Sequence, residues 1–342
     1  MADKLDKYTK DMFEPAKIDS SASERIDKPS LSYWQDAWLR VRKNKAAVAS
    51  IFILLFLIIM ALVGPFLTGY GANTQNLPHA NMPPKIQGLE NISWLPFDGT
   101  RASKDGTIVN VYEQKNIEEY YWFGTDGLGR DLFTRLWKGT QISVYIALLA
   151  AFIDMVIGVA YGAISAYYGG RVDSVMQRIV EILVGIPNLV LIVLLILILE
   201  PGIISITIAL SITGWVGMAR VVRGQVLKLK AQEFVLASMT LGSDNKRIIW
   251  KHLIPNLAGV IIINTMFTIP SAIFFEAFLS FIGLGLKAPL ASLGTLIDDG
   301  FKTLRLYPHL LLFPAIVISV IMICFNMLAD GLRDALDPKM RD

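Results

Sequence analysis

Long apolar stretches alternate with polar segments along this chain. Six stretches are each roughly 20 residues long, the length at which a helix crosses a hydrocarbon layer about 30 Å thick. They cover residues 46–67, 142–167, 179–199, 203–218, 257–286 and 310–328. The pattern predicts an all-α integral membrane protein with six transmembrane helices.

The composition agrees with this prediction. Of the 342 residues, 54% are hydrophobic and 18% are charged, whereas a soluble domain carries about 25% charged residues. The net charge of +3 is too small to indicate nucleic-acid binding. The single cysteine, Cys324, falls in the last apolar stretch, so no intrachain disulfide can form, and we expect it to be a packing residue.

Basic residues gather in two polar segments. Residues 220–256 hold seven lysines and arginines against two acidic residues, and residues 40–45 hold four more basic residues before the first apolar stretch. The positive-inside rule places both segments in the cytoplasm. With six crossings, both termini of this multi-pass membrane protein are then expected in the cytoplasm.

These assignments divide the chain into four parts. Residues 1–45 form a cytoplasmic tail, 46–67 the first membrane helix, 68–141 an extracytoplasmic region, and 142–342 a helical core with a cytoplasmic loop at 220–256. Within the outer region, residues 77–121 predict a small subdomain with a strand at 107–112. A mostly irregular loop is the alternative.

The tail has two sections. Residues 1–28 are charged and poor in large apolar side chains, which is typical of disordered chain. Four apolar residues then follow at helical spacing: Leu31, Trp34, Trp38 and Val41. Because tryptophan prefers the headgroup region, they predict an interfacial helix in contact with membrane lipids. Packing against another subunit is an alternative that the pattern leaves open.

Residues 232–256 are patterned as two short helices about a glycine. We expect a helix over 233–241, a left-handed stop at Gly242, a second helix capped by Ser243, and a break at Pro255. One face of the first helix carries Phe234, Ala237, Ser238 and Leu241. Small residues among apolar ones let a partner approach closely, as in a helix that docks in a groove. A surface turn that merely joins two helices is the alternative.

Here the residues resemble a known family. The order Glu233, Ala237, Ser238 and Gly242, followed by Leu253-Ile254-Pro255, is similar to the EAA loop of ATP-binding cassette (ABC) importer permeases. Its spacing is typical of the oligopeptide, dipeptide and nickel branch. Ser238 stands where the family has a second alanine.

Three further segments resemble the C-type permeases of that branch: Trp122-Phe123-Gly124-Thr125-Asp126 with Gly129-Arg130-Asp131, the run from Leu279 to Gly285, and the run from Asn326 to Pro338. The resemblance covers residues 34–341 except for an apparent insertion at 87–118. It implies a type I importer permease (MetI-like) fold with an external insertion between helices 1 and 2.

The resemblance also implies a function and partners. A second, B-type permease would complete the translocation path, an external binding protein would deliver oligopeptides, and two cytoplasmic ATPases would supply ATP and Mg²⁺. The ATPase-coupling residues would be Glu233, Phe234, Ala237, Ser238, Leu241, Gly242 and Pro255. Dipeptide and nickel permeases share these motifs, so the substrate stays open.

Polar residues at membrane depth are candidates for the path or its gate, because their burial requires a partner or a wet cavity. The candidates are Asp154, Ser211, Asn264, Thr268 and Glu276. For Asp154, a hydrogen-bonded pair and a role in the path are both open. For the hydroxyl and amide residues, bonding between helices is the alternative.

Other function classes find less support. No G-x-x-x-x-G-K-[ST] loop occurs, so the chain is not expected to bind ATP or any other cofactor itself. The three histidines lie far apart without a metal-binding pattern, and no catalytic residue is predicted. A proton-coupled transporter would use Asp154 or Glu276 and would need no docking loop. A receptor or scaffold would rest only on the enlarged outer region.

Overall fold

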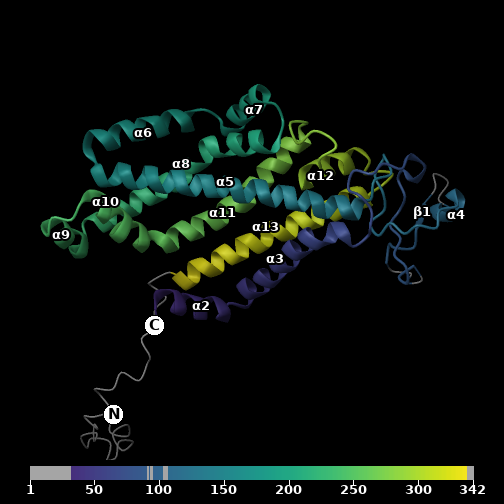
Figure 1. Ribbon diagram of the computed structural model, residues 1–342, viewed down its shortest axis with the longest axis horizontal. Helices are drawn as coiled ribbons and strands as arrows, with labels where there is room; N and C mark the ends of the chain where they lie inside the picture. The colour runs from purple at the N-terminus through teal and green to yellow at the C-terminus, as the bar shows by residue number, and fades with distance from the viewer. Residues whose placement is uncertain (1–31, 91, 93–94, 103–106, 337–342) are drawn as a thin grey trace, which may run out of the picture.

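The computed structural model describes residues 32–336 apart from residues 91, 93–94 and 103–106. The predicted disordered tail, Leu31 of the interfacial helix and the last two residues of the C-terminal motif lie outside the described residues. Figure 1 shows an elongated bundle of helices with α9 and α10 at one end and β1 and α4 at the other. We call these the α9 end and the β1–α4 end.

Five helical segments are long and apolar enough to cross a membrane, and a bent pair makes a sixth if it counts as one span. Their helices are α3 (Lys45–Val63), α5 (Leu132–Tyr168), α8 (Ile203–Lys230), α11 (Ile254–Phe281) and α13 (His309–Leu336). The chain is thus a helical membrane protein, as the apolar pattern predicts. Several helices are longer than the apolar stretches, because they continue into polar sequence at one end.

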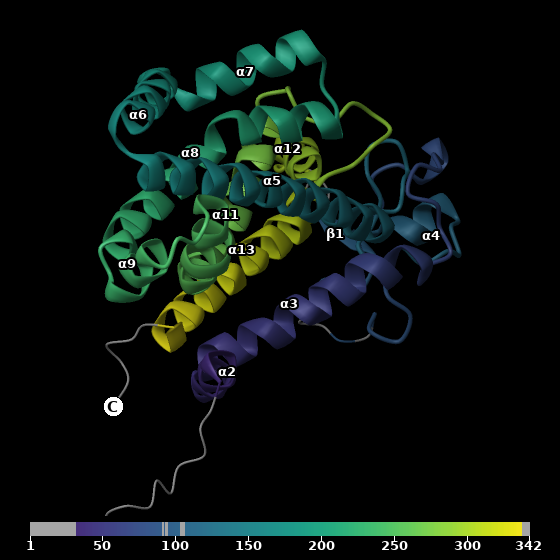
Figure 2. The same cartoon turned by 60° about the vertical axis from the view of Figure 1, so that its left-hand side comes forward.

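The third apolar stretch is not one straight helix, contrary to the prediction. It consists of α6 (Gly170–Gly185) and α7 (Asn188–Leu199), which meet at an angle of 84°. Ile186 between them is extended, with φ −91° and ψ 129°. The following Pro187 excludes the residue before it from helical geometry and has no N–H to donate, so the helix ends there. Figure 2 shows the pair lying outside α5 and α8.

Helices α5 and α8 pack closely along their length in the middle of the bundle (Figure 1). Glycines permit this approach: a methyl group on Gly158 would lie 2.7 Å from the Trp215 carbonyl oxygen of α8. Helix α11 packs against both α5 and α8, and α13 packs against α11 and α3. The shared core is formed by aliphatic side chains such as Ile146, Ile206 and Ile273.

The region between the first two spans has its own small core. It contains the 3₁₀ turns η2 (Gly64–Phe66) and η3 (Leu77–His79), the antiparallel strands β1 (Thr100–Ala102) and β2 (Ile108–Asn110), and α4 (Val111–Lys115). Met82, Tyr112 and Tyr121 are buried together in it. A strand within 107–112 is therefore present, but it ends at Asn110, whose side chain caps α4.

A long helix begins inside the predicted extracytoplasmic region, which was assigned up to residue 141. Helix α5 begins at Leu132, because the Asp131 carboxylate accepts from the Thr134 backbone N–H at 2.9 Å and caps it there. The capping residue is visible in the sequence. Polar residues follow it, so the first turns of the helix do not form part of a continuous apolar stretch.

Two amphipathic helices flank the spans. In α2 (Tyr33–Lys43), Trp34 and Trp38 are exposed and Val41 is buried near Ala335 of α13. Helix α12 (Leu293–Lys302) precedes the last span and was not predicted. Its signal is present, because Ser292 and Thr295 form a capping box.

Helices occupy most of the segment predicted as a cytoplasmic loop at 220–256. Helix α8 continues to Lys230, and only α9 (Glu233–Thr240) and the turn after it stand apart from the long helices. From α10 (Asn245–Arg247) the chain continues through a π-helical turn (Ile248–Leu253) directly into α11. Pro255 therefore does not break the run. It lies in the first turn of α11, where its missing N–H costs little.

Candidate functional site

The turn after α9 is built around Gly242. This glycine has φ +75° and lies outside the helix. Its N–H donates to the Met239 carbonyl at 3.0 Å, and the Ser243 N–H donates to the Ser238 carbonyl at 3.1 Å. This pair of bonds is the Schellman motif, so the predicted left-handed stop is confirmed. The predicted cap is not: Asp244, rather than Ser243, is the N-cap residue of α10.

Helix α9 has one face against the protein and one face free. Val235 is fully buried, and Ser238 is 9% exposed. Ser238 therefore does not share the free face, contrary to the expectation from spacing. Glu233, Phe234, Ala237 and Leu241 are exposed, and Leu241 is 86% exposed. Large apolar side chains left in contact with solvent indicate a surface that another molecule covers.

The α9 segment is fixed to the end of α5. The Tyr167 hydroxyl bonds to the Asn245 amide oxygen at 2.8 Å, and the Tyr167 carbonyl accepts from Lys230 Nζ at 2.5 Å. Val235 also packs in a cluster with Ala163 of α5 and Leu253. Helix α9 and the residues on both sides of it are thereby held against a helix that runs the length of the bundle.

A second candidate site is a cavity of about 290 Å³ among the long helices. Helices α5, α7, α8 and α11 contribute its walls. Asp154, Asn264 and Thr268 line it, so three of the five predicted path residues come together. A neighbouring cavity of about 600 Å³ shares Asn264 and Phe267 as wall residues and extends to Arg333. The two cavities together run along α11 toward the end of α13.

Asp154 is buried within this first cavity and is 4% exposed. Its Oδ1 has no hydrogen-bond partner among the described residues. The alternative of a hydrogen-bonded pair is therefore not found for that oxygen in the part of the chain that the structure describes.

Glu276 and Ser211 lie elsewhere. Glu276 is fully buried, and its two oxygens accept from the hydroxyls of Ser143 at 2.8 Å and Ser280 at 3.0 Å. Ser211 is buried and its hydroxyl has no partner among the described residues. Neither residue lines the cavity that contains Asp154. Membrane depth alone selected all five candidates. The fold separates Glu276, whose two oxygens accept hydrogen bonds, from Asp154, whose Oδ1 has no partner among the described residues.

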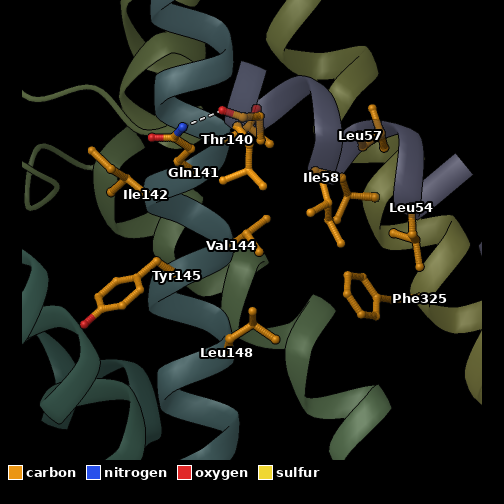
Figure 3. Close-up of a pocket in the computed structure, with 13 residues that line it drawn as sticks. Leu54, Leu57, Ile58, Thr140, Gln141, Ile142, Val144, Tyr145, Leu148 and Phe325 are labelled. Atoms are coloured by element: carbon orange, nitrogen blue, oxygen red, sulfur yellow. Dashed lines mark hydrogen bonds between the residues drawn. The ribbon is translucent and has the colours of Figure 1, made fainter. Parts of the chain in front are cut away.

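A third concavity, between α3 and α5, is almost entirely apolar (Figure 3). Its volume is about 500 Å³, and Leu57, Leu148 and Phe325 are among the residues that line it. The Gln141 amide donates to the Ala61 carbonyl at 2.5 Å, which joins the two helices at the upper edge of the view. None of the predicted path residues lies here, and the lining suits lipid or another apolar surface.

A charged cluster at the start of α5 was missed as a site. Asp126 Oδ2 lies 2.6 Å from Arg130 Nε and 3.4 Å from Arg135 Nε, and all three side chains are less than 10% exposed. Burial raises the pKa of the Asp299 carboxyl in α12 above its usual value. The two nearby arginines oppose this effect only in part. The family motif within residues 122–131 contains Asp126 and Arg130, but the sequence gives no signal for what these two side chains contact.

Comparison with known proteins agrees with this arrangement. The model of the binding-protein-dependent transport system inner membrane component matches residues 158–342. The model of the N-terminal TM domain of oligopeptide transport permease C matches residues 32–84. Both matched ranges contain membrane spans of this structure.

Individual relatives cover nearly the whole chain. The oligopeptide transport system permease protein OppC of Bacillus subtilis (strain 168) is 46% identical over 97% of this chain and 98% of its own length. The dipeptide transport system permease protein DppC of the same organism is 48% identical over 93% and 90%. OppC of Escherichia coli (strain K12) is 37% identical over 93% and 95%.

A solved structure, the inward-facing MetNI methionine ABC transporter, is 18% identical and aligns with a TM-score of 0.46 over 58% of this chain and 96% of that chain. This likeness is too weak to carry an argument. Family membership rests on the two family models and on the relatives, which span the membrane helices and the α9 segment together. The chain belongs to the binding-protein-dependent transport permeases, the non-catalytic membrane subunits of ABC importers, in the group of the C-type oligopeptide and dipeptide permeases.

Proposed function

We propose that this chain forms, with a second, B-type permease, the path through which an ABC importer takes up oligopeptides. Relatives of 46% and 48% identity are named as oligopeptide and dipeptide permeases, which supports peptides as the substrate class. An external binding protein delivers the peptide. Two cytoplasmic ATPases hold the ATP and Mg²⁺, so this chain needs no cofactor of its own.

The α9 end faces the cytoplasm in this proposal, and both termini lie on that side of a bacterial cell membrane. Two features of the fold support the orientation. Helices α2 and α9 lie at the same end of the bundle as the last turns of α13 (Figure 1). That end also carries exposed basic residues, including Lys246, Arg247 and Lys251.

The exposed face of α9 is the contact with an ATPase. Phe234, Ala237 and Leu241 form it, Glu233 favours the positive end of the helix, and Gly242 sets the direction of the chain beyond. The observation that carries this proposal is the combination of a free apolar face with two kinds of attachment to α5. Val235 of α9 packs in a cluster with Ala163, and Tyr167 bonds to residues on either side of α9. Force applied to α9 then reaches the membrane helices.

The test is a bulky substitution on this face, Ala237→Trp. A large ring prevents close approach of the partner, so we expect at least about a tenfold loss of ATP-driven peptide uptake and loss of copurifying ATPase. Membrane insertion should persist, because Ala237 is exposed in this chain. Ala102→Trp is the matched control, an exposed alanine at the β1–α4 end whose substitution should leave ATPase copurification intact.

Normal uptake together with normal copurification in Ala237→Trp would show that α9 does not dock. A mutation that inactivates the phosphate loop of the partner ATPase separates this proposal from a proton-coupled transporter. It should abolish uptake in an ABC importer and leave uptake by a proton-coupled carrier unchanged.

A further inference from the structure

The carboxylate of Asp154 has an unusual environment. It lies on α5 in a cavity among the membrane helices, is 4% exposed, and its Oδ1 has no hydrogen-bond partner among the described residues. A buried carboxylate without a partner is costly, and the cost is recovered when a cation or donor is bound. Asp154 therefore has an interaction available that the described part of the chain does not supply.

The described residues that line the rest of the cavity carry no countercharge, since Asp154 is the one charged residue among them. The side-chain amides of two asparagines in the wall offer both donors and acceptors. Two hydroxyls are arranged as acceptors: the Thr268 hydroxyl donates to the Asn264 carbonyl, and the Ser271 hydroxyl donates to the Phe267 carbonyl, each at 3.0 Å. With their single hydrogens used within α11, these oxygens have only lone pairs left. Lone pairs around one carboxylate suit a group that carries several N–H donors and a positive charge.

The fold keeps the carboxylate in place. A Cβ atom on Gly214 of α8 would collide with the Asp154 carboxylate, with its Cγ 2.7 Å away. Gly217 lies one turn further along α8, in the wall of the same cavity. A Cβ atom added there would have no other atom within 4 Å among the described residues. The glycine at 214 thus leaves room for this side chain, and the one at 217 has no such role.

We infer that Asp154 binds the primary ammonium group of the peptide as it passes through the membrane. The inference rests on the proposed function and adds a position at which the permease itself recognises its substrate. An ammonium group has three donors and a full positive charge. It can therefore pair with the carboxylate and has further donors for the acceptors that line the same cavity.

The test compares trialanine with N-acetyl-trialanine, which lacks the ammonium group. The native chain is reconstituted in vesicles with its partner permease, the ATPases and the binding protein. ATP-driven uptake of each peptide is measured at a concentration that saturates the binding protein, as established by a separate binding measurement. The ratio of the two uptake rates is then compared between the native and variant complexes. Because both contain the same binding protein, its own preference cancels from this comparison.

We expect the native complex to prefer trialanine. Asp154→Asn keeps the shape of the side chain and removes its charge, so trialanine uptake should fall about tenfold or more while N-acetyl-trialanine uptake changes little. Gly214→Ala should reduce the preference as well, because it displaces the carboxylate. Gly217→Ala, the matched substitution, should keep the preference.

Other outcomes overturn the inference. One is equal uptake of both peptides by the native complex. Another is an equal loss of uptake of both peptides in Asp154→Asn, which would mean that the carboxylate supports the fold or pairs with another subunit. An unchanged preference in Asp154→Asn would also overturn it. A native complex that imports neither peptide would instead overturn the proposed function, and the inference with it.

Discussion

At the scale of single residues, Ser143 joins three elements. Its hydroxyl bonds to Glu276 of α11 at 2.8 Å and accepts the Leu293 backbone N–H of α12 at 3.0 Å. Ser143 and Leu293 are fully buried, as is Glu276. One small side chain therefore satisfies a carboxylate oxygen and the first turn of a helix at the same time.

Ser143→Ala should destabilise the protein by about 1–3 kcal/mol, because two buried polar groups lose their partner. Fluorescence-detected thermal unfolding in detergent would measure the change. Ser174→Ala is the control: its hydroxyl bonds to the Gly170 carbonyl at an exposed position, and its loss should cost less than about 0.5 kcal/mol. Equal effects of the two substitutions would contradict this role of Ser143.

The sequence flags Asp154 and Glu276 equally, as acids at membrane depth. It cannot tell them apart, because the partners of Glu276 include Ser143, which is distant in the chain, whereas Asp154 Oδ1 has no partner in the part of the chain that the structure describes. The face of α9 was predicted nearly in full. Ser238 was misplaced since spacing shows which residues share a face but not how the helix is rotated against its neighbours.

At the scale of elements, the fit of α5 against α8 depends on glycine. A Cβ atom on Gly162 would lie 3.0 Å from both the Arg223 backbone nitrogen and the Val222 Cβ, and closer still to the Ala219 carbonyl oxygen. Small residues at such contacts let membrane helices approach until their backbones nearly touch. The long apolar runs of the sequence predict the two helices but not this contact.

Gly162→Leu should force α5 and α8 apart and lower the stability by about 1–3 kcal/mol or more, as overpacking does. The midpoint of thermal unfolding would report it. Gly224→Ala, on α8 and with open space around the added atom, is the control and should be neutral or slightly stabilising. A midpoint unchanged by Gly162→Leu would show that this contact is loose.

Two elements also show where local rules need tertiary context. Pro187 ended a helix inside an apolar stretch, whereas Pro255 did not, because it lies in the first turn of α11. Both prolines lie in the same short sequence, Ile-Pro-Asn-Leu, followed by further apolar residues. The position of a proline within a helix depends on where that helix begins. The start of α11 was misjudged, because the π-helical turn before it was assigned to a loop.

At the scale of the whole molecule, Arg135 connects the region before α5 to the helical bundle. Its side chain is 3% exposed, lies 3.4 Å from Asp126, and donates to the Ala72 carbonyl at 3.1 Å. It also reaches the Pro289 carbonyl, before α12, at 3.5 Å. One guanidinium thus contacts three segments that are far apart in the chain.

Arg135→Ala should destabilise the β1–α4 end by about 3–5 kcal/mol, because the buried Asp126 loses part of its compensation. Limited proteolysis of residues 67–131 and thermal unfolding would detect the change. Arg178→Ala is the control: its pair with Glu181 is exposed, and its loss should cost no more than about 1 kcal/mol. Unaltered proteolysis in Arg135→Ala would contradict the connecting role.

The sequence by itself determined the membrane class, the positions of the apolar segments, the short helix α9 with its glycine stop, and the family. These features depend on local composition and spacing, which short stretches of chain carry within themselves. The tertiary structure decided the bend at Pro187, the rotation of α9, and the separation of Asp154 from Glu276. Each of these depends on contacts between residues far apart in the chain, and only packing of the whole bundle brings them together.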